Sequence, residues 1–335
     1  MTPERWDWDP ASGPSRLNAA LAETGVSWVR APELAEAAPR EPWACAERLL
    51  GERAVLLERQ PIRAVPGGRS FSSGRMAAPF HTDSQTLLGV PPHVQVMACG
   101  GAADVGGESL YLDTWALLAR VEREDPDLLD ALFARARRFP FVFGDVFGPT
   151  VSMRGGSLVF THTARPLPDD DVAARLGPFV ESEPVIEVRA AAGDLVVIHN
   201  HRLLHGRRAF DGEDRSFTRL LMWRARPWPA PSAWQARAEA AARTVRERLR
   251  DAPAGVREAY GLAETAGDGG RRLGVVLELL RGVPPGVISA REGVPEPEIY
   301  RWRDAVLRGG AASLAEDAAP TARDGGPEAW LDRLR

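Results

Sequence analysis

The chain has 335 residues and a mass of 36.4 kDa, with 44% hydrophobic and 26% charged residues, an ordinary globular composition. The chain has 42 basic and 46 acidic residues, and this charge balance excludes a strongly basic nucleic-acid-binding protein. All 42 basic residues are arginine, so the absence of lysine excludes lysine-based Schiff-base or phosphate-loop chemistry. Two distant cysteines, Cys45 and Cys99, suit neither a disulfide framework nor a thiolate zinc site. Without a signal-like start or an apolar run of ~20 residues, we expect a soluble cytoplasmic protein with no membrane segment.

Short strands dominate the first two thirds of the chain. Residues 49–57 lead into a strand, and a turn-rich loop follows at residues 66–74. Asp113 and Thr114 begin a helical region that restarts at Pro126. The remaining β-like runs predict strands at residues 93–99, 108–112, 157–160, 184–189, 194–199 and 215–223. Many short strands with one main helical insertion favour a β-sandwich or small barrel over a doubly wound sheet.

The composition changes near residue 230, where an Ala- and Arg-rich helical stretch begins. Further on, Leu273, Val276, Leu277 and Leu280 recur at helical spacing and predict one apolar stripe. The expected divisions are a first domain at 1–230, a helical connector at 231–268, a small helical domain at 269–315 and a tail at 316–335.

His81 and Asp83 form the most informative short motif. Two residues apart on a strand, their side chains point to one side, with Cα atoms about 7 Å apart, and they can share one metal ion. A third ligand is available from His199, His201 or His205. Two imidazoles and one carboxylate leave three positions of an octahedral ion open, and this is the ligand set of non-haem Fe(II) oxygenases.

Two arginines follow the histidine-rich segment. If residues 215–223 form a strand, Arg215 and Arg219 share one face with Phe217, Leu221 and Trp223. Guanidinium groups among apolar neighbours require anions, because an unpaired buried charge is costly. Their planar donors suit a carboxylate in particular. This strand therefore predicts a site for an acidic ligand.

Four motifs together resemble those of the Fe(II)- and 2-oxoglutarate-dependent dioxygenases of the taurine dioxygenase and clavaminate synthase type. The resemblance extends over about residues 65–228, in the order that the family has. The motifs are PFHTD at 79–83, GGESL at 106–110, NHRLLHGR at 200–207 and DRSFTR at 214–219.

The resemblance implies roles for individual residues. His81, Asp83 and His205 would bind iron, and Arg215 would bind the distal carboxylate of 2-oxoglutarate. Ser109 stands where relatives usually carry a threonine whose hydroxyl assists that carboxylate.

Arg219 would lie near an acidic group of the substrate, as an arginine does in relatives. His199 departs from the family, since an aspartate commonly precedes the asparagine at that position, which is not a ligand position. Arg75, Ser84, Gln85 and His162 are further candidates for contact with the substrate.

The fold implied is mainly β with helices: a double-stranded β-helix (jelly roll, cupin-like) core, with a helical insertion after Asp83, plus a small all-α C-terminal domain. The cofactors implied are Fe(II), 2-oxoglutarate as co-substrate and O2. The reaction implied is hydroxylation of an unactivated C–H bond in a small amino-acid-like or carboxylate-bearing metabolite, with succinate and CO2 as co-products. Halogenating relatives have a small residue in place of Asp83, so its carboxylate favours hydroxylation.

Two alternatives remain open. His199, His201 and His205 share strand parity, so they could form a zinc site of a different enzyme. Residues 271–308 also resemble helix-turn-helix units of transposase-associated proteins, which would make the protein a 2-oxoglutarate- or iron-responsive DNA-binding regulator. That segment has seven arginines and five acidic residues, a net charge of only +2, so packing, oligomerisation or partner docking is favoured over DNA binding.

Overall fold

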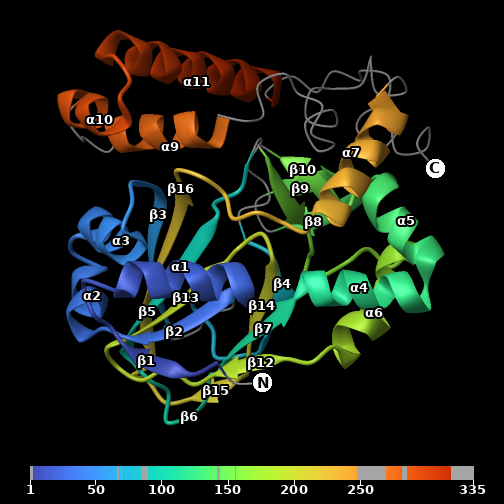
Figure 1. The fold of residues 1–335 in the computed structure, drawn as a ribbon, viewed down its shortest axis with the longest axis horizontal. Helices are drawn as coiled ribbons and strands as arrows, with labels where there is room; N and C mark the ends of the chain where they lie inside the picture. Colours follow the sequence, from blue (N-terminus) through green and yellow to red (C-terminus); the bar gives the residue numbers. More distant parts are fainter. Residues whose placement is uncertain are drawn as a thin grey trace.

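Two antiparallel-rich sheets form the centre of the molecule in the computed structural model, and helices flank them (Figure 1). Among the described residues, no helix is both long and apolar enough to span a membrane. The structure describes residues 3–65, 68, 70–83, 90–141, 144–154, 156–246, 269–280 and 285–317.

The larger sheet has six strands in the order β1–β2–β13–β5–β16–β3. β1 and β2 pair in parallel, and the other neighbouring pairs are antiparallel. Every residue of β13 is buried, because this strand is covered on both faces. In sheet order the strands are Arg5–Asp7, Val26–Arg30, Asp194–His199, Val94–Gly101, Ser216–Arg224 and Ala54–Arg63. The strands predicted at 93–99, 194–199 and 215–223 are therefore confirmed.

The smaller sheet has four antiparallel strands in the order β12–β7–β14–β4. Apolar side chains fill the space between the sheets, with Ile198 and Phe217 from the larger sheet against Tyr111 and Leu203 from the smaller one. This packing confirms the expected β-rich core. In sheet order the strands are Ile186–Val188, Ser109–Asp113, Leu203–Arg207 and Ala78–His81.

Within the described residues, three two-stranded ladders lie outside these sheets. They pair β8 (Arg137–Phe141) with β9 (Gly144–Gly148), β10 (Val151–Arg154) with β11 (Ser157–Phe160), and β6 (Val105–Gly106) with β15 (Phe210–Asp211).

Three N-terminal helices cover the outer face of the larger sheet, shown in blue in Figure 1. Leu17, Leu34 and Leu49 pack there against Leu220 and Met222 of β16. The helices are α1 (Gly13–Glu23), α2 (Pro32–Ala37) and α3 (Pro42–Leu50).

A second helical group follows β7. It starts at Thr114, and the Asp113 side chain caps the first helix by accepting a hydrogen bond from the Trp115 N–H at 2.9 Å, as the sequence predicted. α6 was not expected, although Asp170 caps it in the same way. The helices are α4 (Thr114–Glu124), α5 (Pro126–Ala134), α6 (Asp171–Ser182) and α7 (Ser232–Arg246).

The C-terminal helices are α9 (Gly269–Leu280), α10 (Pro285–Glu292) and α11 (Glu296–Asp317), which lie together beyond β3 and β16 (Figure 1). Val275 of α9 packs on Ile288 and Ile299, whereas Leu277 packs on the β3–β16 cluster. The predicted single apolar stripe is therefore wrong: α9 contacts two partners on different faces, and Leu280 is 50% exposed. The domain boundaries stay a prediction, and residues 247–268 and 318–335 of the connector and tail lie outside the described residues.

Candidate metal centre and anion pocket

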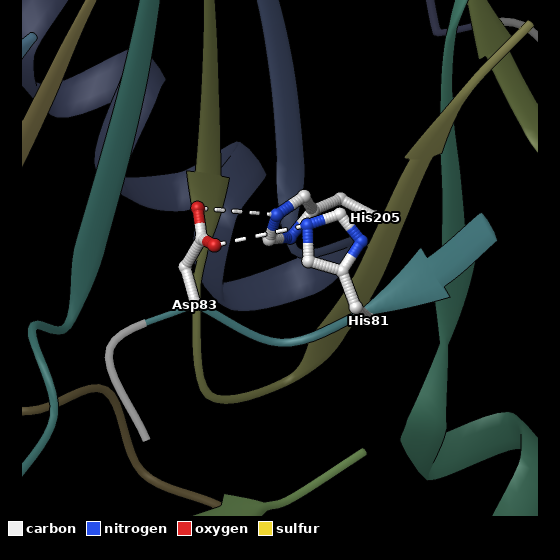
Figure 2. Close-up of side chains that lie close together, drawn as sticks. All are labelled: His81, Asp83 and His205. Carbon is white, nitrogen blue, oxygen red and sulfur yellow. Dashed lines mark ion pairs between the residues drawn. The ribbon is translucent and has the colours of Figure 1, made fainter. Parts of the chain in front are cut away.

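His81 and His205 lie directly opposite each other on β4 and β14. Their ring centroids are 4.4 Å apart, and both rings lie beside the Asp83 carboxylate (Figure 2). β4 ends at His81, so Asp83 lies just beyond the strand. Thr82 between them is held by its backbone N–H and its hydroxyl, which both donate to the carbonyl of His162, at 3.1 and 3.0 Å.

The ligand atoms of these three residues converge. Nε2 of His81 lies 3.7 Å from Oδ1 of Asp83, and Nε2 of His205 lies 3.3 Å from Oδ2. All three residues offer an atom within 4.8 Å of the others, which makes this the group among the described residues that can hold a metal ion. The separation suits one ion because metal–ligand bonds of about 2 Å radiate from a common centre.

A hydrogen bond sets the tautomer of His81. Its Nδ1 lies 2.8 Å from the carbonyl oxygen of Pro79, which can only accept, so Nδ1 carries the proton and Nε2 presents a free electron pair. Burial, helped by the neighbouring His205, lowers the pKa of His81 to about 4. The ring is therefore neutral at pH 7, as a metal ligand must be.

Asp83 is held ionised by its neighbours. Burial works to raise the pKa of this carboxyl, but the Arg219 guanidinium and the His205 imidazole outweigh it and keep the pKa well below its ordinary value. Gln95 of β5 donates to Oδ2 at 2.9 Å, and Arg219 donates to the same oxygen. These contacts fix the carboxylate toward the two imidazoles.

Arg215 is a buried cation without a carboxylate partner among the described residues. Its side chain is 3% exposed, and its hydrogen bond to the Gly107 carbonyl is long, at 3.5 Å. The guanidinium lies over the rings of Phe210 and Phe217, at 5.0 and 4.5 Å. Burial, and then the like charge of Arg207, lower the pKa of Arg215 to about 10, so the group stays charged at pH 7. A buried unpaired guanidinium of this kind favours an anion.

The three candidate ligands and Arg215 line one cavity of about 90 Å³. Ser109 and Arg219 line it too, so Arg215 and Arg219 contribute to the same cavity. Its other walls are Ile62, Phe71, Ser72, Ala78, Gln95, Met97, Tyr111, Gly206 and Arg207. Mixed apolar walls with a few convergent polar groups are typical of a small-molecule site.

The remaining candidates for substrate contact fall in different places. Arg75 is exposed and pairs with Glu213 at 3.3 Å. His162 contributes its backbone to the Thr82 contacts and is not among the cavity-lining residues. Ser84 and Gln85 lie outside the described residues.

The alternative zinc cluster does not form. His199 ends β13, a turn follows at Asn200–Arg202, and β14 begins at Leu203, so His205 is carried into the other sheet. The strand parity assumed for the three histidines is broken by that turn. His201 instead bonds the Pro91 carbonyl through Nε2 at 2.7 Å.

Some functional neighbours escaped prediction. Gln95 and Tyr111 sit within ordinary strand sequences and carry no motif. Arg207 belongs to the NHRLLHGR motif, which gives it no role of its own, and Phe71 lies in the turn-rich loop at residues 66–74.

The chain matches one family model over more than half of its length. The model of the family described as "Taurine catabolism dioxygenase TauD, TfdA family" matches residues 15–183 and 169–225. The chain belongs to the TauD/TfdA family. Enzymes of the TauD/TfdA family are non-haem oxygenases that use Fe(II), 2-oxoglutarate and O2. No curated protein sequence matches the chain significantly.

Several solved structures are similar to this TauD/TfdA chain. An asparagine oxygenase in complex with Fe(II), 2S,3S-3-hydroxyasparagine and succinate has a TM-score of 0.52 at 17% identity, covering 63% of this chain and 79% of its own. The PvcB protein from Pseudomonas aeruginosa has a TM-score of 0.48 at 19% identity, covering 64% and 81%. A non-haem iron oxygenase, OrfP, in complex with (3S)-hydroxy-L-Arg has a TM-score of 0.46 at 15% identity, covering 66% and 94%.

The donor set of this TauD/TfdA chain fits Fe(II). Two imidazole nitrogens and one carboxylate oxygen, converging beside a cavity, are a set of donors that would hold Fe(II) and leave positions for further ligands. The unpaired Arg215 in the same cavity fits a co-substrate with a second carboxylate. The residues present thus match the cofactors of the family.

Proposed function

We propose that this protein is an Fe(II)- and 2-oxoglutarate-dependent dioxygenase that hydroxylates an unactivated C–H bond of a small amino-acid-like or carboxylate-bearing metabolite. Succinate and CO2 would be its co-products. The observation that carries the proposal is one cavity lined both by the convergent His81, Asp83 and His205 and by the buried, carboxylate-free Arg215. A metal chelated by a 2-oxo acid needs these two features together.

Each residue has a distinct task in this proposal. His81 and His205 bind the ion through Nε2, and Asp83 binds it through its carboxylate. Arg215 binds the distal carboxylate of 2-oxoglutarate, and Ser109, 8% exposed in the same cavity, supplies a hydroxyl donor beside it. When bound, Fe(II) with 2-oxoglutarate and O2 supplies the oxidising chemistry, while the protein orients the reactants and excludes water.

Arg219 is the proposed contact for an acidic group of the substrate. It lines the cavity beside Asp83 and pairs with Glu58 of β3 at 3.2 Å. Glu58 is half-buried, so a substrate carboxylate arriving from solvent can replace it without stranding a buried charge. Because Asp83 already fills the position that halogenating relatives leave open, hydroxylation is the proposed outcome.

The decisive test compares two carboxylates. In Asp83→Asn we expect Mn2+ binding, measured by anaerobic calorimetry, to weaken by at least about 100-fold, the upper end of what loss of an outer-shell contact costs. Asp211→Asn, at an exposed position of β15, is the matched control and should bind as the wild type does. Succinate formation with a panel of L-amino acids then tests turnover. Equal Mn2+ binding by both variants would refute the assignment.

We also propose that the two sheets form a double-stranded β-helix and that the C-terminal helices form a packing unit rather than a DNA reader. Its arginines are largely engaged with acids, as in the pairs Arg271–Glu292 and Arg303–Asp304. Glu296 and Glu298 in the first turn of α11 add negative charge where DNA phosphates would approach.

A further inference from the structure

A loop of residues 70–77 forms one wall of the metal cavity. Phe71 and Ser72 line the cavity, and the Phe71 ring lies against the His81 imidazole with centroids 5.2 Å apart. Within the loop, the backbone N–H groups of Ser73 and Gly74 donate to the Ser70 carbonyl, at 3.2 and 2.7 Å. These turns shape the loop locally, so its place over the metal site depends on contacts from outside.

Arg207 supplies such contacts. It follows His205 by two residues on β14 and is 7% exposed. Its Nη1 donates to the Phe71 carbonyl at 2.8 Å, and its Nη2 donates to the carbonyls of Gly74 and Met76 at 3.0 and 2.5 Å. One guanidinium therefore holds three points of one loop, through charged donors that bond more strongly than neutral ones.

The ring of Phe210 lies near both the Arg207 guanidinium and the Arg215 guanidinium of the anion pocket. The Arg207 guanidinium lies 4.8 Å from the Phe210 centroid, and the Arg215 guanidinium lies 5.0 Å from it. Both cations are buried, and neither pairs with a carboxylate among the described residues. Two like charges close together in a poorly solvated place repel each other, and an anion bound at Arg215 relieves that repulsion.

We propose that Arg207 is a positioning residue that holds loop 70–77, with Phe71, against the metal site, and that 2-oxoglutarate bound at Arg215 strengthens this hold. The second half rests on the proposed function; the first half does not. A ligand can shift the loop only through a difference in interaction free energy between its held and released states. Here the difference is the repulsion from Arg215 that Arg207 feels when its guanidinium is seated on the loop carbonyls. Bound 2-oxoglutarate thereby stabilises loop 70–77 as the wall of the cavity that the substrate contacts.

Hydrogen exchange of the loop amides tests both halves. Wild-type protein with saturating Mn2+ is followed with and without 2-oxoglutarate, and exchange at Ser73 and Gly74 should slow by about tenfold when it is present. In Arg207→Gln the same amides should exchange faster than in the wild type and show no response to 2-oxoglutarate. Arg208→Gln is the matched control, because the neighbouring Arg208 pairs with Glu187 at 2.7 Å on the surface; it should behave as the wild type.

The outcomes distinguish the positioning role of Arg207 from its coupling to 2-oxoglutarate. Equal loop exchange in Arg207→Gln and Arg208→Gln overturns the positioning role. Calorimetric binding of 2-oxoglutarate to the wild type without slower loop exchange overturns the coupling. Absence of that binding refutes the proposed function and the coupling together, while the comparison of the two variants still decides the positioning role. Should Arg207→Gln fail to fold, Arg207→Lys keeps the charge but lacks the planar fork, and its loop should exchange at an intermediate rate.

Discussion

Arg219 donates a hydrogen bond to Oδ2 of Asp83, so the arginine proposed for the substrate is paired directly with a candidate metal ligand. The pairing keeps the Asp83 pKa low and the carboxylate ionised, and it also places a cation beside the position of the ion. The two effects oppose each other for metal binding. The carboxylate keeps its orienting hydrogen bond from Gln95 if Arg219 is removed.

Replacing Arg219 therefore separates metal binding from substrate binding. In Arg219→Gln we expect Mn2+ affinity at pH 7 to stay at or above that of the wild type, since a positive neighbour is lost and Asp83 remains charged. We expect kcat/KM for an acidic substrate to fall by about 30- to 1000-fold, the loss of roughly 2–4 kcal/mol when a charged hydrogen-bond partner is removed. Arg59→Gln, exposed on β3, is the control. A tenfold loss of Mn2+ affinity would instead assign Arg219 to the metal site.

Short sequence motifs indicated part of the site, whereas contacts between side chains on distant strands could not be predicted from the sequence. Short motifs in the order of a known family indicated His81, Asp83 and His205, and the structure brings these three side chains together. Their role as metal ligands stays a prediction. The pairing of Arg219 with Asp83 joins β16 to the end of β4, and nothing in sequence spacing indicates which side chains meet across sheets. The histidine alternative failed for a related reason, because parity along a strand carries no information past the turn at residues 200–202.

For the fold as well, local sequence signals do not show which elements pack against each other. Buried strands such as β13 are continuous apolar runs and were found readily. α6 contains Pro178 and starts after a proline- and aspartate-rich stretch, so its local signals favour a loop, and packing of Leu176 and Val180 in the helical core stabilises it instead. Leu280 fitted the helical period, but which face of α9 meets the sheet is decided by tertiary contacts.

The anion pocket gives a second prediction. Arg215→Met keeps the apolar contact with Phe210 and Phe217 but removes the donors, so the affinity for 2-oxoglutarate in the presence of Mn2+ should fall by about 30- to 1000-fold. Calorimetry measures it, with Arg208→Met as the matched surface control. Mn2+ binding itself should not change. An unaltered affinity for 2-oxoglutarate would show that the distal carboxylate binds elsewhere.

A buried carboxylate fastens the C-terminal helices to the rest of the chain. Glu278 is fully buried, accepts a hydrogen bond from the Trp43 indole of α3 at 2.8 Å and pairs with Arg291 of α10. Glu278→Ala leaves these donors without their acceptor, and the free energy of unfolding should fall by about 2–4 kcal/mol in urea titrations.

The control for that change is Glu239→Ala in the exposed face of α7, expected to cost less than about 0.5 kcal/mol. Gly274 provides an independent check: a Cβ there would lie 2.2 Å from Val55 and 2.8 Å from Trp223, so Gly274→Ala should also destabilise the protein. Unchanged stability in both Glu278→Ala and Gly274→Ala would mean that α9 is not fastened to the sheet.

The histidines His93, His199 and His201 make the stability depend on pH. They are buried away from the metal site, and burial lowers the pKa of His201 to about 4 and those of the other two well below the ordinary value. Below about pH 6.5 these histidines bind protons in the unfolded chain but stay unprotonated in the folded chain. The free energy of unfolding therefore falls as the pH drops, by up to about 1.4 kcal/mol per pH unit for each histidine. For His201 the loss is complete near pH 4. Urea unfolding at pH 7.5, 6.0 and 5.0 should show a shallower pH dependence in His201→Gln than in the wild type, and equal slopes would contradict the assignment.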